Sequence, residues 1–331
     1  MIICRTPLRL SFFGGGTDLR SYYHLRPGRV ISTGLQRYIY VVVREQVDFV
    51  ENRYRINWSQ TEFCDDIDEI ENPIAREVLR KFGIYRPIEL TTFSDIPAGT
   101  GLGSSSSFCV GLVNAIHALN GDRITKSSLA SEAAEIELDI LCRDMGKQDH
   151  FAAAYGSFNV FTFNADETVR VEPVHYDPDV AEALNESLML FYMGTQRNAS
   201  DVLRAQAEAT AEKEDVLTAM QEMVDPMVEI LSGHGDLADV GPMLHESWLL
   251  KRSITGQISN DAIDHAYRTA MEAGSSGGKL VGAGGGGFLM LFVAPDRQAA
   301  VSEALAGMSF IRPGFDTAGS RITYYEPNRL T

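Results

Sequence analysis

The sequence predicts an α+β protein with two lobes, because strand-like and helix-like segments are interleaved in both halves of its 331 residues. Segments rich in β-branched and aromatic residues predict strands at 2–13, 29–44, 51–63, 88–93, 158–163, 168–173, 188–193, 280–293 and 321–325. Apolar residues at helical spacing predict helices at 74–82, 108–119, 125–142, 200–232, 237–253 and 260–273. The pattern changes near residue 180, so we place the two lobes at 1–180 and 181–331.

The segment 97–107, PAGTGLGSSSS, lies between a predicted strand and a predicted helix. Gly99, Gly101 and Gly103 allow backbone conformations that other residues resist, and they let a ligand approach closely. The free N–H groups and the positive dipole end of the following helix then face an anion. Serine hydroxyls at such a place can also ligate Mg²⁺ carried by a nucleotide. We therefore interpret the segment as a phosphate-binding loop; a flexible linker is disfavoured by the flanking strand and helix.

Composition and charge argue against several classes of partner. The formal net charge of −16 disfavours a nucleic-acid binder, which needs a clustered basic surface, although a few local cations can still bind a small phosphate. The four cysteines are far apart and form no C-x-x-C, so neither a zinc site nor a redox motif is indicated. No apolar run reaches about 18 residues, and the N-terminus lacks the features of a signal peptide. We expect a cytoplasmic protein with no nucleic-acid or membrane partner.

Two familiar nucleotide-binding motifs do not fit their surroundings. Gly278-Lys279 is followed by leucine, where a Walker A loop requires serine or threonine. The pattern G-x-G-x-x-G occurs at 282–287, but a strand-like segment follows it, whereas a Rossmann loop must open a helix. A dinucleotide-binding dehydrogenase is therefore disfavoured. We expect 282–287 to be a glycine-rich turn between strands or, preferably, a flexible loop packed near a ligand that is assembled elsewhere.

Three motifs in this order resemble the GHMP kinase superfamily, which includes galactokinase, homoserine kinase and mevalonate kinase. They are 7–18 (PLRLSFFGGGTD), 97–107 and 279–288 (KLVGAGGGGF), and together they span nearly the whole chain. The variant GGGTD at 14–18 and the segment 245–253 (HESWLLKRS) resemble the sugar-1-kinase branch. The resemblance implies a two-lobe GHMP kinase fold, with an N-terminal lobe like domain 2 of ribosomal protein S5 and a ferredoxin-like C-terminal lobe. ATP and the sugar would meet between the lobes.

The resemblance assigns the reacting groups to two positions. Asp149, in the segment GKQD at 146–149, matches the catalytic aspartate, which would accept the proton of the attacking hydroxyl or orient that hydroxyl. Arg9 matches a position that is often lysine in relatives, and it would offset charge on the transferred phosphoryl group. Without the resemblance, Asp149 could be a helix cap or a solvated charge, and Arg9 could simply pair with a carboxylate.

The resemblance also implies sites for Mg²⁺ and for ATP. Ser105 and Glu137 match the two protein ligands of Mg²⁺. The register leaves alternatives open at Ser104, Ser106, Glu135 and Asp139. The residues that would contact ATP are Pro97, Gly99, Thr100, Gly101, Leu102, Gly103, Ser104, Ser105 and Ser106.

The acceptor sugar would lie against the first and third motifs, where Asp18 matches the aspartate that binds sugar hydroxyls. The further contacts implied are Gly15, Gly16, Thr17, Gly284 and Gly285. A phosphate on the sugar would need a cluster of cations. From the candidates Arg20, Arg29, Arg197, Lys251 and Arg252 we select Arg197 and Lys251.

The activity implied is Mg·ATP-dependent phosphorylation of the anomeric hydroxyl of D-glycero-D-manno-heptose 7-phosphate. The 1,7-bisphosphate formed would feed nucleotide-activated heptose for a surface polysaccharide. The expected partners are ATP and a small sugar phosphate; the oligomeric state stays open, a homodimer included. A fucose- or other hexose-1-kinase is an alternative, and it would need no site for a sugar phosphate. A non-catalytic sugar-binding regulator is disfavoured because Asp149, Glu137 and Ser105 are all present.

Overall fold

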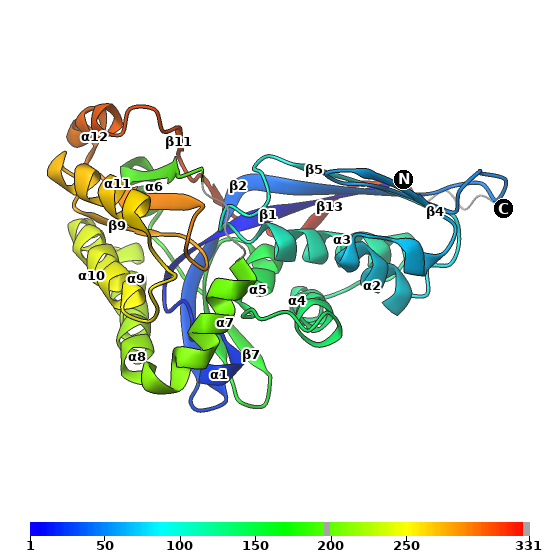
Figure 1. Cartoon of the computed structure of the whole chain (residues 1–331), viewed down its shortest axis with the longest axis horizontal. Coiled ribbons are helices and arrows are strands. Elements are labelled where there is room, and N and C mark those ends of the chain that lie inside the picture. Colours follow the sequence, from blue (N-terminus) through cyan, green and yellow to red (C-terminus); the bar gives the residue numbers. More distant parts are fainter. Residues whose placement is uncertain (195–198, 327–331) are drawn as a thin grey trace.

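The computed structural model describes residues 1–194 and 199–326, which form two β-sheets with helices packed on them (Figure 1). Within these residues the larger sheet has nine strands: β1 (Ile2–Phe13), β2 (Gly28–Glu45), β3 (Tyr54–Asn57), β4 (Thr61–Cys64), β5 (Ile88–Ser94), β6 (Phe158–Phe163), β7 (Val169–Pro173), β12 (Phe315–Asp316) and β13 (Arg321–Tyr325). The main path through this sheet is β13-β1-β2-β5-β3-β4. β6 and β12 also pair with β2, and β7 pairs with β6.

The long strands β1 and β2 form the centre of the larger sheet. They pair antiparallel from Ile2↔Val43 to Phe13↔Ile31, and nearly all of β1 is buried. One face of the sheet is covered by four helices (Figure 1): α2 (Pro73–Lys81), α3 (Ser104–Asn120), α4 (Lys126–Glu135) and α5 (Gln148–Tyr155). α3 packs across both β1 and β2, and the loop that precedes it is held against β1 by a hydrogen bond from the Arg9 N–H to the Leu102 carbonyl at 3.0 Å.

The smaller sheet has the order β11-β8-β10-β9 in the described residues. Its strands are β8 (Leu188–Tyr192), β9 (Gly277–Leu280), β10 (Phe288–Phe292) and β11 (Phe310–Ile311). The other helices are α1 (Arg20–Tyr23), α6 (Pro178–Ser187), α7 (Ala199–Ala209), α8 (Glu214–Glu222), α9 (Val224–Leu231), α10 (Val240–Arg252), α11 (Asp261–Glu272) and α12 (Gln298–Ala304). α10 packs along β9, and α11 contacts β10. No helix in the described ranges is long and apolar enough to cross a bilayer.

Several predicted elements are divided in the structure. The strand predicted at 51–63 is the hairpin of β3 and β4. The helix predicted at 200–232 is interrupted, and its last break lies at Met223, between α8 and α9. Pro226 explains that break, since a proline lacks an N–H and its ring clashes with the carbonyl four residues earlier. The prediction that 282–287 joins two strands is confirmed, because β9 and β10 pair antiparallel on either side of it.

The chain returns to its first sheet at the end. β12 pairs with β2, and β13 pairs with β1 from Ile2↔Tyr325 to Arg5↔Arg321. The lobe boundary predicted at 180/181 falls inside α6. The segment after 181 therefore contributes all four strands of the smaller sheet and two strands of the larger one.

Candidate active site

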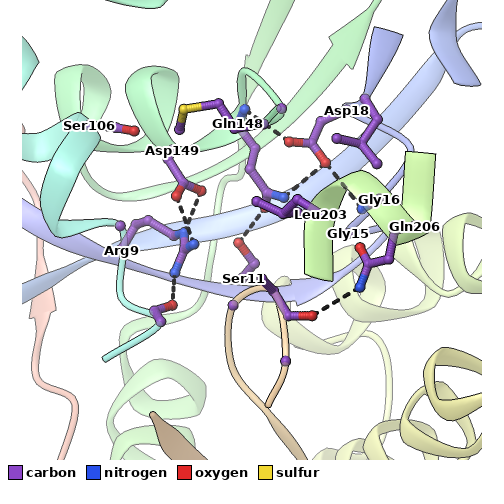
Figure 2. A pocket seen from close by; sticks show the side chains of 18 of the residues that line it. Arg9, Ser11, Gly15, Gly16, Asp18, Ser106, Gln148, Asp149, Leu203 and Gln206 are labelled. Carbon is purple, nitrogen blue, oxygen red and sulfur yellow. Dashed lines mark hydrogen bonds and ion pairs between the residues drawn. The ribbon is translucent and has the colours of Figure 1, made fainter. Parts of the chain in front are cut away.

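A cavity is lined by residues of both sheets, among them Arg9 of β1 and Lys279 of β9, and Figure 2 shows several of the side chains that line it. Its lining comes from β1, the turn after β1, the start of α3, the start of α5, α7, α10 and residues 282–286. We call residues 97–103 the phosphate loop and residues 282–287 the glycine loop. The two loops contact each other: a Cβ on Gly287 would lie 2.3 Å from the Thr100 carbonyl oxygen, and a Cβ on Gly282 would lie 2.6 Å from Gly101 Cα. Each loop thus fixes the position of the other.

The phosphate loop leaves the N-terminus of α3 open toward the cavity. Gly103 precedes the helix with φ +75°, a left-handed conformation that favours glycine, and no side chain caps the first turn. The first N–H groups of α3 therefore have no intrahelical partner. The Ser106 hydroxyl is buried without a hydrogen-bond partner among the described residues, and Ser106 lines the cavity. These donors fit the phosphates of a nucleotide.

Arg9 and Asp149 form a bidentate ion pair at the centre of the cavity (Figure 2). Arg9 Nε donates to Asp149 Oδ1 at 2.6 Å, and Arg9 Nη2 donates to Asp149 Oδ2 at 2.8 Å. Arg9 Nη1 also donates to the Gly101 carbonyl of the phosphate loop. Asp149 lies in the first turn of α5 and Arg9 on β1. The ion pair therefore connects the phosphate loop to the carboxylate expected to meet the acceptor hydroxyl.

Glu137 lies behind Ser105 in a cluster of polar groups, of which Glu137 and His150 are fully buried. Ser105 Oγ donates to Glu137 Oε1 at 2.6 Å, and His150 Nε2 lies 2.8 Å from Glu137 Oε2. Arg143 Nη1 donates both to Ser105 Oγ, at 2.6 Å, and to Glu137 Oε1, at 2.5 Å. Burial raises the pKa of Glu137, but His150, Ser105 and Arg143 together outweigh it and lower that pKa to about 2.

The pair Ser105 and Glu137 fits a magnesium ion that is shared with a nucleotide. Mg²⁺ is usually held by one or two carboxylates together with substrate phosphates. An ionised carboxylate and a hydroxyl beside an open helix N-terminus supply that donor set. Among the described residues, no group of three or more His, Cys, Asp or Glu side chains is arranged to hold a metal ion. Glu137 lies on a single π-helical turn, Ile136–Ile140, and such turns often occur at functional sites.

Asp18 faces the same cavity in a network of neutral donors (Figure 2). It accepts hydrogen bonds from the Gly16 N–H at 3.1 Å, the Gln148 N–H at 3.3 Å and Gln148 Nε2 at 2.9 Å. Ser11 Oγ in turn donates to Gln148 Oε1 at 2.6 Å. Burial raises the pKa of Asp18, and the charge of Asp149 raises it further. A Cβ on Gly146 would lie 1.8 Å from Asp18 Oδ2, so only glycine leaves room for this carboxylate.

Lys251 is placed at the cavity, whereas most of the other candidate cations are not. Lys251 lines the cavity and donates to the Gly282 carbonyl. Three other candidates are held by carboxylates away from the cavity lining. These are Arg20 with Asp139, Arg29 with Asp225, and Arg252 with Asp264. Arg197 lies outside the described residues.

The structure brings together most of the other predicted contacts, with some exceptions. The predicted ATP and sugar contacts that line the cavity are Gly99, Gly101, Gly103, Ser104, Ser105, Ser106, Gly15, Gly16, Asp18 and Gly284. Those outside its lining are Pro97, Thr100, Leu102, Thr17 and Gly285. Thr17 is fully buried, and its hydroxyl donates to the Gly14 carbonyl at 2.7 Å. It stabilises the turn that carries Asp18 and does not face the cavity.

Sequence reasoning missed several residues of the site. Lys279 of β9 lines the cavity and is only 5% exposed. Gln206 of α7 donates to the Ala283 carbonyl of the glycine loop at 2.9 Å (Figure 2). Arg143 donates a hydrogen bond to Glu137, and Gln148 donates one to Asp18. Lys279 carried a readable signal, because a lysine among small and aliphatic residues (GGKLVGA) is unusual in a buried strand; the others carried none.

Comparison with known proteins gives consistent results. The family model described as GHMP kinases N terminal domain matches residues 70–157, and the one described as GHMP kinases C terminal matches residues 227–308. The D-glycero-alpha-D-manno-heptose 7-phosphate kinase of Campylobacter jejuni subsp. jejuni serotype O:2 is 29% identical in a 315-residue alignment that covers 91% of this chain and 92% of that protein. The galactokinase of Pyrococcus furiosus is 26% identical in a 242-residue alignment that covers 64% of this chain and 66% of that one.

A similar fold is found in a solved structure. A crystal structure described as a D-glycero-D-manno-heptose 1-phosphate kinase from Bacteriodes thetaiotaomicron matches with a TM-score of 0.75. The match covers 98% of this chain and 99% of that one at 24% identity. At this identity the likeness shows the fold alone.

Proposed function

Because this chain belongs to the GHMP kinase family, we propose that it transfers a phosphoryl group from Mg·ATP to the anomeric hydroxyl of D-glycero-D-manno-heptose 7-phosphate. The product would be the 1,7-bisphosphate, a precursor of nucleotide-activated heptose for a surface polysaccharide. The observation that carries the proposal is the Arg9–Asp149 pair, which lies between the open N-terminus of α3 and the acceptor-facing Asp18. This arrangement supplies a phosphate cradle, a base and a hydroxyl-binding carboxylate in one cavity.

The residues divide the work of phosphoryl transfer, which depends mostly on positioning and on neutralising charge. Asp18, held by Gln148 and Gly16, binds and orients sugar hydroxyls. Asp149 accepts the proton of the attacking hydroxyl or fixes its direction. Arg9 holds Asp149 in place and adds positive charge beside the phosphate loop. Mg²⁺ bound by Ser105 and Glu137 would neutralise charge on the nucleotide phosphates.

We choose the sugar from the similarity of this sequence to those of two sugar kinases. The heptose 7-phosphate kinase named above is similar over nearly all of both chains. The galactokinase similarity favours a second candidate, a fucose- or other hexose-1-kinase. Lys251 supports the first candidate, because it lines the cavity and pairs with no carboxylate among the described residues, which suits an acceptor that carries a phosphate.

The test is ADP release from Mg·ATP with a panel of acceptors: heptose 7-phosphate, unphosphorylated heptose, mannose 6-phosphate, fucose and galactose. We expect turnover on heptose 7-phosphate and a kcat at least about 100-fold lower in the D149N protein, as for loss of a general base. Equal melting temperatures of the two proteins would show that the loss is chemical. Preference for an unphosphorylated sugar would support the second candidate, and turnover on none of them would contradict both.

A further inference from the structure

Two lysines lie on the wall of the cavity that the C-terminal half of the chain provides. Lys251 is on α10 and Lys279 is on β9, and both line the cavity. The Lys251 ammonium donates to the Gly282 carbonyl of the glycine loop, and the Lys279 ammonium donates to the Phe12 carbonyl of β1. An ammonium has three N–H donors, so each lysine keeps donors beyond its bond to the backbone.

Neither lysine has a carboxylate partner. Among the described residues, no carboxylate oxygen lies within 4.0 Å of either ammonium, whereas Lys81 and Lys147 are paired with Glu135 and Glu167. A buried cation without a counter-charge is costly to keep. The two ammonium groups therefore lie in a place where an anion would be stabilised.

The charged groups near the two lysines make the binding of an anion there more favourable. Arg9 on β1 and the lysines repel one another, while Asp18, in the turn after β1, attracts Lys251. Asp149 on α5 is already neutralised by Arg9. Burial, followed by the charge of Arg9, lowers the pKa of Lys251 to about 8, and burial with the charges of Lys251 and Arg9 lowers the pKa of Lys279 well below its usual value.

We propose that Lys251 and Lys279, together with Arg9, form a subsite for a phosphate group on the glycine-loop wall of the cavity. The proposal rests on the proposed function, which it deepens, because the reaction offers two sources of that phosphate. One is the phosphate that the acceptor sugar already carries, and the other is the phosphoryl group in transfer. Either one brings negative charge to three cations, and within the part of the chain that the structure describes only Arg9 among them has a carboxylate partner.

The test uses the K251M and K279M proteins, which keep the length of the side chain and remove the charge. Lys126 provides the matched control K126M, because its ammonium also donates to backbone carbonyls, at 2.8 Å, but far from the cavity lining. Calorimetry would measure the binding of heptose 7-phosphate, of unphosphorylated heptose and of Mg·AMP-PNP. Inorganic phosphate would be titrated as well, alone and with Mg·AMP-PNP already bound.

We expect K251M and K279M to bind a phosphate-bearing ligand at least about tenfold more weakly, as for the loss of charged hydrogen bonds. Binding of unphosphorylated heptose should be unchanged, and K126M should match the wild type throughout. A loss on heptose 7-phosphate, and on inorganic phosphate with Mg·AMP-PNP bound, would identify the acceptor's own phosphate. A loss confined to Mg·AMP-PNP would identify the transferred group. Either outcome supports the subsite.

Proton uptake provides a readout that a merely structural lysine would not change. At pH 8, wild-type protein should take up protons when it binds inorganic phosphate, since the anion stabilises the charged lysines. Titrations in two buffers of different ionisation enthalpy would measure this uptake, and they need no variant to fold. The subsite would be overturned if both variants kept wild-type affinity for all three phosphate-bearing ligands (heptose 7-phosphate, inorganic phosphate and Mg·AMP-PNP), or if the wild type took up no protons. Phosphate binding that depends on the lysines, in a protein that turns over none of the sugars, would leave the subsite standing and remove only the proposed function.

Discussion

Asp18, which lines the cavity, and Glu137, which lies behind the cavity residue Ser105, are both buried carboxylates, yet their surroundings differ in kind. Glu137 is surrounded by His150, Ser105 and Arg143, and its pKa falls to about 2. Asp18 has only amide donors around it and faces the like charge of Asp149, so its pKa rises. One environment keeps a permanent negative charge, which suits a metal ion. The environment of Asp18 contains neutral hydrogen-bond donors, and it suits a carboxyl group that forms hydrogen bonds with sugar hydroxyls. Similar burial thus produces opposite chemistry because the partners differ.

The largest effect expected from this contrast is on stability. The E137Q protein should lose about 3 kcal/mol of unfolding free energy, because the change removes a fully buried carboxylate from the pairs that it makes with Arg143 and His150. The D18N protein should lose less than about 1 kcal/mol, since its neutral partners can bond an amide oxygen. Urea unfolding without Mg²⁺ would measure both. Equal losses of unfolding free energy in the two proteins would show that the different surroundings of Glu137 and Asp18 do not affect stability.

A smaller effect is expected in the pH dependence of stability. The pKa of Asp18 lies above its ordinary value of 3.8 in the native protein. The native state therefore binds this proton more tightly, so the stability that Asp18 contributes is complete below pH 3.8 and is lost as pH rises through the native pKa. The D18N protein has no such loss, and its stability relative to the wild type should rise with pH above about 4. Unfolding curves from pH 4 to pH 7 would test this, and a difference that falls with pH would refute it.

The smallest effect concerns Arg143, which donates to both proposed magnesium ligands. Its guanidinium occupies hydrogen-bonding positions on Ser105 and Glu137 that a metal ion would need. Because Arg143 is partly exposed, its competition should be modest, and the R143M protein should bind Mg·ADP about threefold more tightly. Calorimetry would measure this change. The R20M protein is the control, because Arg20 pairs with Asp139 and touches neither ligand; weaker binding by R143M would mean that Arg143 supports the nucleotide.

Much of the fold could be predicted, because β1 and β2 are long and follow the alternation of a buried sheet. The helix α5 was missed, since Phe151-Ala-Ala-Ala-Tyr155 is too short to show a helical period, and packing in the core stabilises it. The helix α6 was missed despite a readable signal, an Asp177 cap followed by proline at the first helical position.

The site was predictable in parts but not as an arrangement. The glycines of the phosphate loop and the serines that directly follow it predict an anion site through local chemistry alone. The pairing of Arg9 with Asp149 joins β1 to α5, so no local pattern could choose between a catalytic arginine and one that holds a carboxylate. In the structure Arg9 makes that pair and also borders the phosphate loop. The two interpretations were therefore never exclusive.

The pairing of β13 with β1 gives the molecule a particular order of assembly. β1 forms the middle of the larger sheet only when β13 covers its outer edge, and β13 follows every other described strand along the chain. Until then β1 presents an unpaired edge, which is a template for aggregation. Contacts between such distant segments also slow folding. The larger sheet therefore becomes complete only after the strands of the smaller sheet have been made, and a chain released from a ribosome that stalls near residue 300 would still have an unpaired edge on β1.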